Sequence, residues 1–123
     1  MTYVDGFVLP VKKNNLKAYK KMAALGGKIW KKHGALHYFE CLGDDLKSAK
    51  KWGCLQFTKM AKAKPDETVF FSFIVFKSKA HRNKVNALVM KDPLMQNPEW
   101  KNKPMPFDMK RMAVGGFKTI VKR

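Results

Sequence analysis

Four segments of the chain carry the apolar, aromatic and β-branched residues that are typical of β-strands. They are residues 3–11, 35–42, 68–76 and 111–121. The third segment is apolar at nearly every position, so we expect both faces of this strand to be buried. Adjacent glycines at 115 and 116 interrupt the last segment and predict a glycine bulge there.

Two segments show the 3.6-residue spacing of amphipathic helices. The first predicted helix begins after an N-cap at Asn14 or Asn15 and ends before Gly34, which supplies a C-terminal stop. The second spans about residues 79–91 and begins after Ser78, whose hydroxyl suits an N-cap. Adjacent glycines inside the first helix indicate a kink or a close approach of another group.

Three polar stretches connect these elements. Residues 46–53 are rich in lysine and predict a loop. Residues 54–63 mix two periodicities, and we favour an extended strand or a hairpin arm over a helix for them. Residues 92–109 contain four prolines and several asparagines, which predicts a long loop of the kind that often carries function.

The order of elements is therefore strand, helix, strand, inserted arm, strand, helix, strand. This order is typical of the split βαβ arrangement, an α+β fold with an antiparallel sheet, and the length of 123 residues suits a single domain over 1–123. Two helices cover only one face of a four-stranded sheet. Because the third strand is apolar on both faces, we expect a second copy of the chain to cover the other face in a homodimer.

The charge balance is strongly basic. Lysine and arginine together number 26 against nine acids, which gives a formal net charge of +17, and three of the 26 are arginine. Such a surface attracts polyanions, but lysine makes few of the bidentate contacts that read bases, so any nucleic-acid contact should be nonspecific. One face of the first helix gathers Lys17, Lys21, Lys28 and Lys32. A solvated helix face explains the same pattern.

Cellular location and metal chemistry follow from what the sequence lacks. No apolar run approaches the roughly 18 residues that cross a bilayer, and the first residues do not resemble a signal peptide. The two cysteines, Cys41 and Cys54, stand far apart without partners at zinc-ligand spacing. We therefore expect a cytoplasmic protein with reduced thiols, no metal site and no membrane contact.

Larger blocks of sequence resemble the YbaA-like family of bacterial proteins. The blocks are YVDGFVLPV, GALHYFECLGDD, KAKPDETVFFSFIVFKSKAHR and MPFDMKRMAVGGF, in this order. The resemblance implies a ferredoxin-like fold of the dimeric α/β-barrel superfamily, with the sheets of two copies facing each other, and it implies no assigned reaction. This chain differs from the family pattern at Met109, where glycine is common, and in its higher charge.

Some relatives within that superfamily degrade haem, and in some of them a histidine at the position resembling His81 binds the iron. Their pattern also has an asparagine on the first strand and a tryptophan on the third. Here Asp5 and Phe73 stand in the corresponding segments. We therefore interpret His81 as a surface histidine and expect no cofactor.

Four polar residues border apolar segments and are candidates for a ligand cleft between sheet and helices, with or without enzyme activity: Asp5, His37, Glu40 and Asp108. Alternation along a strand puts His37 on the face opposite Glu40, which favours a structural role for Glu40 over joint acid–base chemistry. Asp108 has Lys110 and Arg111 as candidate partners in a salt bridge or turn cap. The alternative function is a noncatalytic basic module that contacts nucleic acid or another polyanion.

Overall fold

The computed structural model describes residues 1–96 and 105–123, and its strands and helices follow the predicted order. The strands and helices are β1 (Tyr3–Lys12), α1 (Leu16–Lys32), β2 (His37–Leu42), α2 (Phe57–Met60), β3 (Glu67–Phe76), α3 (Lys79–Met90) and β4 (Ala113–Lys118). Short 3-10 turns are η1 (Lys13–Asn15), η2 (Ser48–Trp52) and η3 (Met109–Arg111). Part of the predicted loop 92–109 lies outside the described residues.

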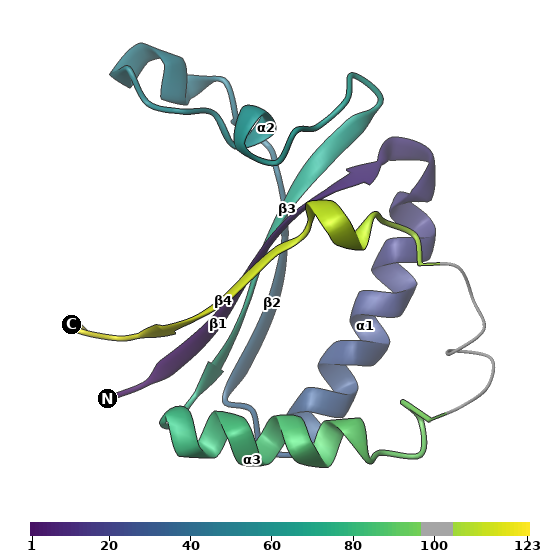
Figure 1. The fold of residues 1–123 in the computed structure, drawn as a ribbon, viewed down its shortest axis with the longest axis vertical. Helices are drawn as coiled ribbons and strands as arrows, with labels where there is room; N and C mark the ends of the chain where they lie inside the picture. Colours follow the sequence, from purple (N-terminus) through teal and green to yellow (C-terminus); the bar gives the residue numbers. More distant parts are fainter. Residues whose placement is uncertain (97–104) are drawn as a thin grey trace.

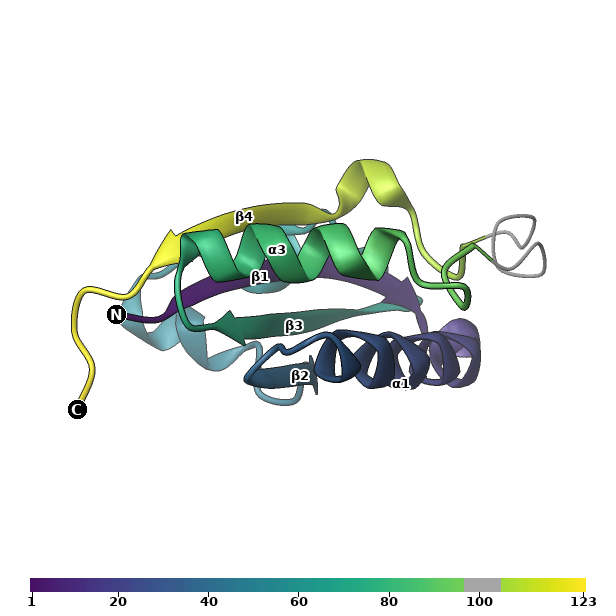
Figure 2. The ribbon, with the colours of Figure 1, turned by 90° about the horizontal axis from the view of Figure 1, so that it is seen from below.

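The four strands form one antiparallel sheet in the order β2-β3-β1-β4, as Figure 2 shows. The central strands β1 and β3 pair along ten residues. Side chains of paired residues lie on the same face of the sheet, and successive pairs alternate between the two faces. Helices α1 and α3 lie on one side of this sheet (Figure 1). This is the ferredoxin-like α+β arrangement, and it confirms the predicted fold class.

The core fills the space between the sheet and these two helices. One cluster of buried side chains joins α1 and α3 to the end of β3, and it includes Ile29, Ile74, Phe76, Val85 and Val89. A second cluster lies under the first half of α1 and includes Leu9, Val11, Tyr19, Ala23 and Phe70. Fully burying one such aliphatic or aromatic side chain contributes about 1.5 to 3 kcal/mol, so these clusters hold the helices on the sheet.

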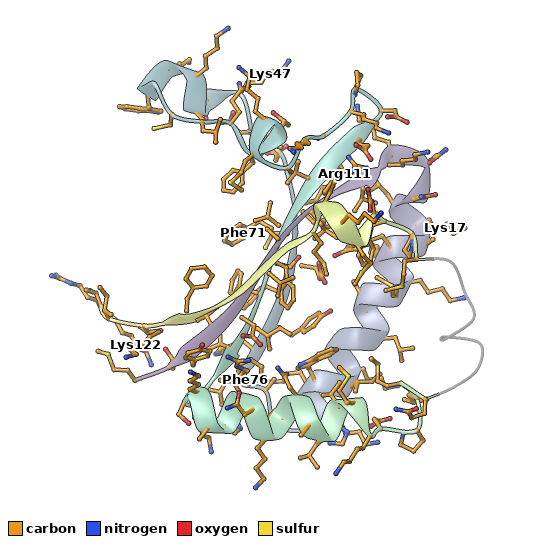
Figure 3. The ribbon with its side chains drawn as sticks, viewed as in Figure 1. Lys17, Lys47, Phe71, Phe76, Arg111 and Lys122 are labelled. Atoms are coloured by element: carbon orange, nitrogen blue, oxygen red, sulfur yellow. The ribbon has the colours of Figure 1, made fainter. Side chains whose placement is uncertain are left out.

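The opposite face of the sheet is open within one chain. It presents Phe39, Phe71 and Phe117, whose exposed fractions are 48%, 47% and 64%. In Figure 3, Phe71 points away from the helices, whereas Phe76 points toward α3. A single copy therefore buries only one face of β3, and the expectation that both faces are buried requires a partner.

The predicted helix ends are confirmed in position, with one difference in chemistry. The Ser78 hydroxyl accepts a hydrogen bond from the His81 amide at 3.1 Å, and Gly34 follows α1 with φ of +111°. Asn15 occupies the N-cap of α1, but its side chain makes no cap hydrogen bond. Instead its amide donates to the Pro106 carbonyl at 3.3 Å, so Asn15 ties the helix to the segment before β4.

The prediction of an extended strand over residues 54–63 is wrong. Amide groups of Met60 and Ala61 donate to the carbonyls of Gln56 and Phe57, which closes the single helical turn of α2. Instead of pairing with a strand, this segment packs on the sheet, where α2 sets Phe57 edge-on against Phe71, with ring centroids 6.1 Å apart. We name residues 46–63 the arm; Figure 1 shows it extending from the side of the sheet opposite α1.

The predicted glycine bulge in the last strand is also wrong. Gly115 pairs with Gly6 and Gly116 pairs with Asp5 in an uninterrupted ladder between β1 and β4. The reason for a glycine at 116 is space, since a Cβ there would collide with the hydroxyl of Tyr3. Glycine at 116 therefore leaves room for the Tyr3 side chain, and the strand stays regular.

Candidate functional site

A carboxylate held by three hydroxyl groups lies between α1 and the sheet. Glu40 projects from β2 on the face that the helices cover, opposite Ser72 of β3. One of its oxygens, Oε1, accepts hydrogen bonds from the Tyr19 hydroxyl, at 2.8 Å, and from the Ser72 hydroxyl. The other oxygen, Oε2, accepts one from the Tyr38 hydroxyl at 3.1 Å. Three separate elements, α1, β2 and β3, thus converge on one charged group.

Local sequence explains how the three hydroxyls reach Glu40. Tyr38 and Glu40 are two residues apart in a strand, so their side chains share a face. A Cβ at Gly27 would lie 2.8 Å from the Tyr38 ring, so glycine at this position lets the ring lie directly against α1. This confirms the close approach that the paired glycines indicated. Ser72 is the polar interruption in the apolar strand β3, a signal that sequence analysis passed over.

The hydroxyls stay protonated at neutral pH. Burial, and then the nearby charge of Glu40, raise the pKa of Tyr19 and the pKa of Tyr38 well above the ordinary value. Each tyrosine therefore donates its proton to the carboxylate. Among the described residues Glu40 makes no ion pair, so the cluster balances its negative charge with neutral donors alone.

The carboxylate opens into a groove of about 740 Å³ between α1 and β2. Its walls are mostly apolar and comprise Leu16, Ala23, Ala24, Gly27, Leu42 and Phe70, with Lys17 and Lys20 also lining it. Behind Glu40 lies a smaller cavity of about 180 Å³, lined by side chains that include Met22, Trp30 and Phe107. Glu40, Tyr19 and Tyr38 border both spaces. The groove thus combines an apolar surface with one charged acceptor.

Asp5, the first predicted cleft residue, belongs to a different cluster. It is buried on the helix face of β1, where Oδ2 accepts a hydrogen bond from the Asn86 amide at 3.3 Å and Oδ1 lies 3.6 Å from Nε of Arg82. Asn86 in turn accepts a hydrogen bond from the Trp30 indole at 3.0 Å. This network ties α3 to β1 and α1, which is a structural arrangement.

The other two predicted cleft residues lie apart from the groove. His37 is exposed on the open face of the sheet, 6.1 Å from the Phe39 ring between centroids. Asp108 caps η3, where it accepts hydrogen bonds from the Lys110 amide and the Arg111 guanidinium, and these contacts lower its pKa. The structure therefore does not bring the four residues to one cleft, and of the four it is Glu40 that lines the groove between α1 and β2.

A buried ion pair that sequence analysis did not single out joins β3 to the segment before β4. Arg111 donates from Nη1 to Oε1 of Glu67 at 2.6 Å and from Nη2 to Oε2 at 2.7 Å. The Arg111 guanidinium lowers the pKa of Glu67 to about 2. In Figure 3, Arg111 lies beside the start of β3. One available signal was the residue type at 111, because the planar guanidinium of arginine forms bidentate pairs with carboxylates and most basic residues of this chain are lysines.

The lysines predicted as a polyanion contact lie on the exposed side of α1. Lys17, Lys21 and Lys28 are exposed, and no ion pair involves them among the described residues. Lys32 pairs with buried Asp92 at 3.1 Å, and His33 Nε2 lies 2.6 Å from the same carboxylate oxygen. Lys32 therefore makes a structural ion pair, whereas the other three lysines face solvent.

Clusters of metal-ligating side chains and the surroundings of His81 bear on the sequence-based candidates for a metal or haem site. Within residues 1–96 and 105–123, no group of three histidine, cysteine, aspartate or glutamate side chains is placed to hold a metal ion. The His81 ring accepts a hydrogen bond at Nδ1 from the Lys77 amide at 2.9 Å, next to the start of α3.

Within the residues that the structure describes, no helix is long and apolar enough to cross a membrane.

Comparison with known proteins identifies the family. Residues 2–109 match a family model described as a protein of unknown function, DUF1428. The chain is 40% identical over 121 residues to the uncharacterized protein YbaA of Escherichia coli strain K12, covering 98% of each chain, and equally similar to YbaA of Shigella flexneri. The chain belongs to the DUF1428 family. The YbaA-like resemblance seen in the sequence is thereby confirmed.

A solved structure shares the fold of this DUF1428 member. It is the crystal structure of a dimeric ferredoxin-like protein from an uncultured marine organism, with a TM-score of 0.54 and 12% sequence identity, and the match covers 100% of both chains. At this identity the likeness establishes the fold alone.

Proposed function

We propose that this protein is a homodimer that binds a small, largely apolar molecule in the groove between α1 and β2. The observation that carries the proposal is the carboxylate of Glu40, which opens into an apolar groove of about 740 Å³ without a cationic partner among the described residues. Ligand sites typically combine apolar walls with a few placed polar groups. We further propose a cytoplasmic location, which the two unpaired cysteines support.

The open face of the sheet supports the homodimer. Phe71, Phe73 and Phe117 line an apolar hollow of about 670 Å³ on this face, and Met60 extends the hollow to the arm. Exposed apolar patches of this kind typically mark a protein interface. The structural neighbour with the same fold is described as dimeric, which supports a second copy of this chain as the partner.

The homodimer is tested by measuring mass in solution. Light scattering at micromolar concentration should give about twice 14.2 kDa. Phe71→Asp places a charge on the open face and should shift the mass toward one chain, whereas Lys91→Asp, an exposed residue after α3, should not. A single-chain mass for the wild type contradicts the homodimer.

The groove is tested with a pair of matched substitutions. Ala24 lines the groove on α1, and Ala87 is an exposed alanine on α3. A library of small molecules is screened by ligand-observed NMR against the wild type. Binding should disappear in Ala24→Trp, because the indole fills the groove, and persist in Ala87→Trp. Hits that bind both variants equally contradict the groove as the site.

Contact with polyanions is a second candidate, favoured by the exposed lysines of α1. Lys17, Lys21 and Lys28 share one side of the helix, and the formal net charge of +17 adds a long-range attraction. Such binding is electrostatic, so two oligonucleotides of unrelated sequence should bind alike and lose affinity steeply with salt. Replacing these three lysines by glutamine should weaken binding more than replacing Lys50, Lys51 and Lys59. Strong preference for one sequence contradicts this candidate.

A further inference from the structure

We propose that the groove between α1 and β2 takes a primary amine with an apolar body, whose ammonium group pairs with the carboxylate of Glu40. The inference rests on the proposed function of this groove as a ligand site, and it adds the charge and class of the ligand. Three features of the described residues carry it: the hydrogen-bond count at Glu40, the protonation of the tyrosines and the apolar walls.

The first feature is an acceptor position left open on Glu40. A carboxylate offers about four lone-pair positions, two on each oxygen. At Oε1 both positions are used, by Tyr19 and Ser72, whereas at Oε2 only Tyr38 donates. Glu40 therefore keeps one acceptor position for an incoming donor. Neutral hydroxyls also leave its negative charge without a counter-ion, which a cationic ligand would supply.

The second feature is that the tyrosine hydroxyls present acceptors and no free protons. Tyr19 and Tyr38 each donate their one proton to Glu40, so only the oxygen lone pairs remain for a ligand. An ammonium has three N–H groups, which suit a site built of acceptors, and aromatic rings beside it add cation–π attraction. A carboxylate ligand would find no free donor on Glu40, Tyr19 or Tyr38 and would have to pair with the exposed ammonium groups of Lys17 or Lys20 instead.

The third feature is the wall that leads away from Glu40. Leu16, Leu42 and Phe70 line the groove together with the small side chains of α1. An alkyl or aryl body buries apolar surface there, and each added methylene should tighten binding roughly fourfold while it fits. Lys17 and Lys20 also line the groove but make no ion pair with Glu40. Both lysines are exposed, so solvent and salt screen their charges more than the charge of the half-buried Glu40, and the carboxylate decides the preference.

The experiment compares three probes of equal length: n-hexylamine, 1-hexanol and hexanoate. Their dissociation constants are measured by ligand-observed NMR at neutral pH, and Ala24→Trp shows which signal comes from the groove. The amine should bind about tenfold more tightly than the alcohol, and hexanoate should bind most weakly at the groove. Equal or tighter groove binding of hexanoate overturns the inference.

Substitutions test whether Glu40 sets this order. In Glu40→Gln the affinity for hexylamine should fall about tenfold, whereas hexanol should bind nearly as before, because the walls are unchanged. Asp44→Asn removes an exposed acid in the following turn and should leave both affinities unchanged. Tyr38→Phe keeps the carboxylate and should weaken the amine severalfold, which provides a second variant if the first does not fold.

The outcomes separate this inference from the proposed function. If no probe binds, or if Ala24→Trp leaves all binding unchanged, the groove is not a ligand site, and both the proposed ligand binding and the amine assignment fail. If hexanol and hexylamine bind equally in the groove of the wild type, or if Glu40→Gln keeps the preference for the amine, the groove remains a ligand site and the amine assignment fails.

Discussion

Glu40 and Glu67 are strand carboxylates on neighbouring strands of one sheet, yet their surroundings differ in charge. Glu67 begins β3 and accepts two hydrogen bonds from the guanidinium of Arg111, besides one from the Lys64 amide. Glu40 lies near the end of β2 and accepts hydrogen bonds from three neutral hydroxyls. One carboxylate is fully paired within the chain, and the other keeps its charge facing a groove.

The difference separates a structural carboxylate from a candidate binding carboxylate. A bidentate arginine pair satisfies both oxygens and the charge, so nothing remains for a ligand to complete. Hydroxyl donors orient a carboxylate without cancelling its charge, which leaves an electrostatic role open. Burial by itself does not make this distinction, since Glu67 is the more buried of the two.

The largest effect on stability should come from breaking the pair at Glu67. Arg111→Met removes the guanidinium and leaves a buried carboxylate with one amide donor, so the melting temperature should fall on the order of 10 °C. Arg123→Met, at the exposed C-terminus, is the matched control and should melt like the wild type. Thermal unfolding followed by circular dichroism measures both. If the two variants melt at the same temperature, the pair between Arg111 and Glu67 does not stabilise the fold.

The same ion pair should make the stability of the protein depend on pH in the acid range. The pKa of Glu67 is lowered from 4.5 to about 2 by Arg111, so the folded state favours the charged carboxylate. A depressed pKa contributes stability above about pH 4.5 that is lost as the pH falls toward 2. The urea midpoint should therefore drop over this interval in the wild type and less steeply in Glu67→Gln.

Asp92 should account for part of the acid-induced loss of stability that remains in Glu67→Gln, because His33 and other donors also lower the pKa of Asp92 to about 2. The wild type and Glu67→Gln should therefore both lose stability in acid, the wild type more. Parallel curves for the two proteins would contradict the assignment of the pair.

Glu40→Gln should cost less stability than either change at the ion pair. The amide oxygen still accepts from two hydroxyls, so the loss should be about 1 kcal/mol, the net value of a typical hydrogen bond. Chemical denaturation of Glu40→Gln beside Asp44→Asn measures this difference. A loss of about 3 kcal/mol or more, with ligand affinity unchanged, would make Glu40 as structural as Glu67.

The smallest effect is expected on the ionisation of the tyrosines around Glu40. Burial is the main cause of the raised pKa of Tyr19 and of Tyr38, and the charge of Glu40 adds to it. Glu40→Gln should therefore lower both pKa values while leaving them above the ordinary value of 10. Alkaline titration followed by tyrosinate absorbance measures the shift. A titration curve identical to that of the wild type would show that the carboxylate charge does not act on these hydroxyls.

Periodicity along the chain was enough to predict the fold. The spacing of apolar residues gave four strands and two long helices in the correct order, and Ser78 and Gly34 marked helix ends that the structure confirms. These signals are local, because a strand repeats every two residues and a helix every 3.6. The same local rule separated His37 from Glu40 on opposite faces of β2.

Long-range contacts determine the conformation of the segments that periodicity did not predict correctly. The α2 turn within 54–63 forms where Phe57 packs against Phe71, and Gly116 of the regular strand β4 leaves room for the side chain of Tyr3. Short segments have weak intrinsic preferences, so such tertiary contacts select their conformation.

By itself the sequence determined the α+β class, the order of the strands and helices along the chain, the basic surface and the family. Tertiary structure alone decided which carboxylate is paired and which faces a groove. Tyr19 and Ser72 stand 21 and 32 positions from Glu40, and Arg111 stands 44 positions from Glu67. Such partners meet only when the sheet fixes its register and α1 packs across it, because hydrogen bonds require contact in space and the pattern of a single strand carries no record of its neighbours.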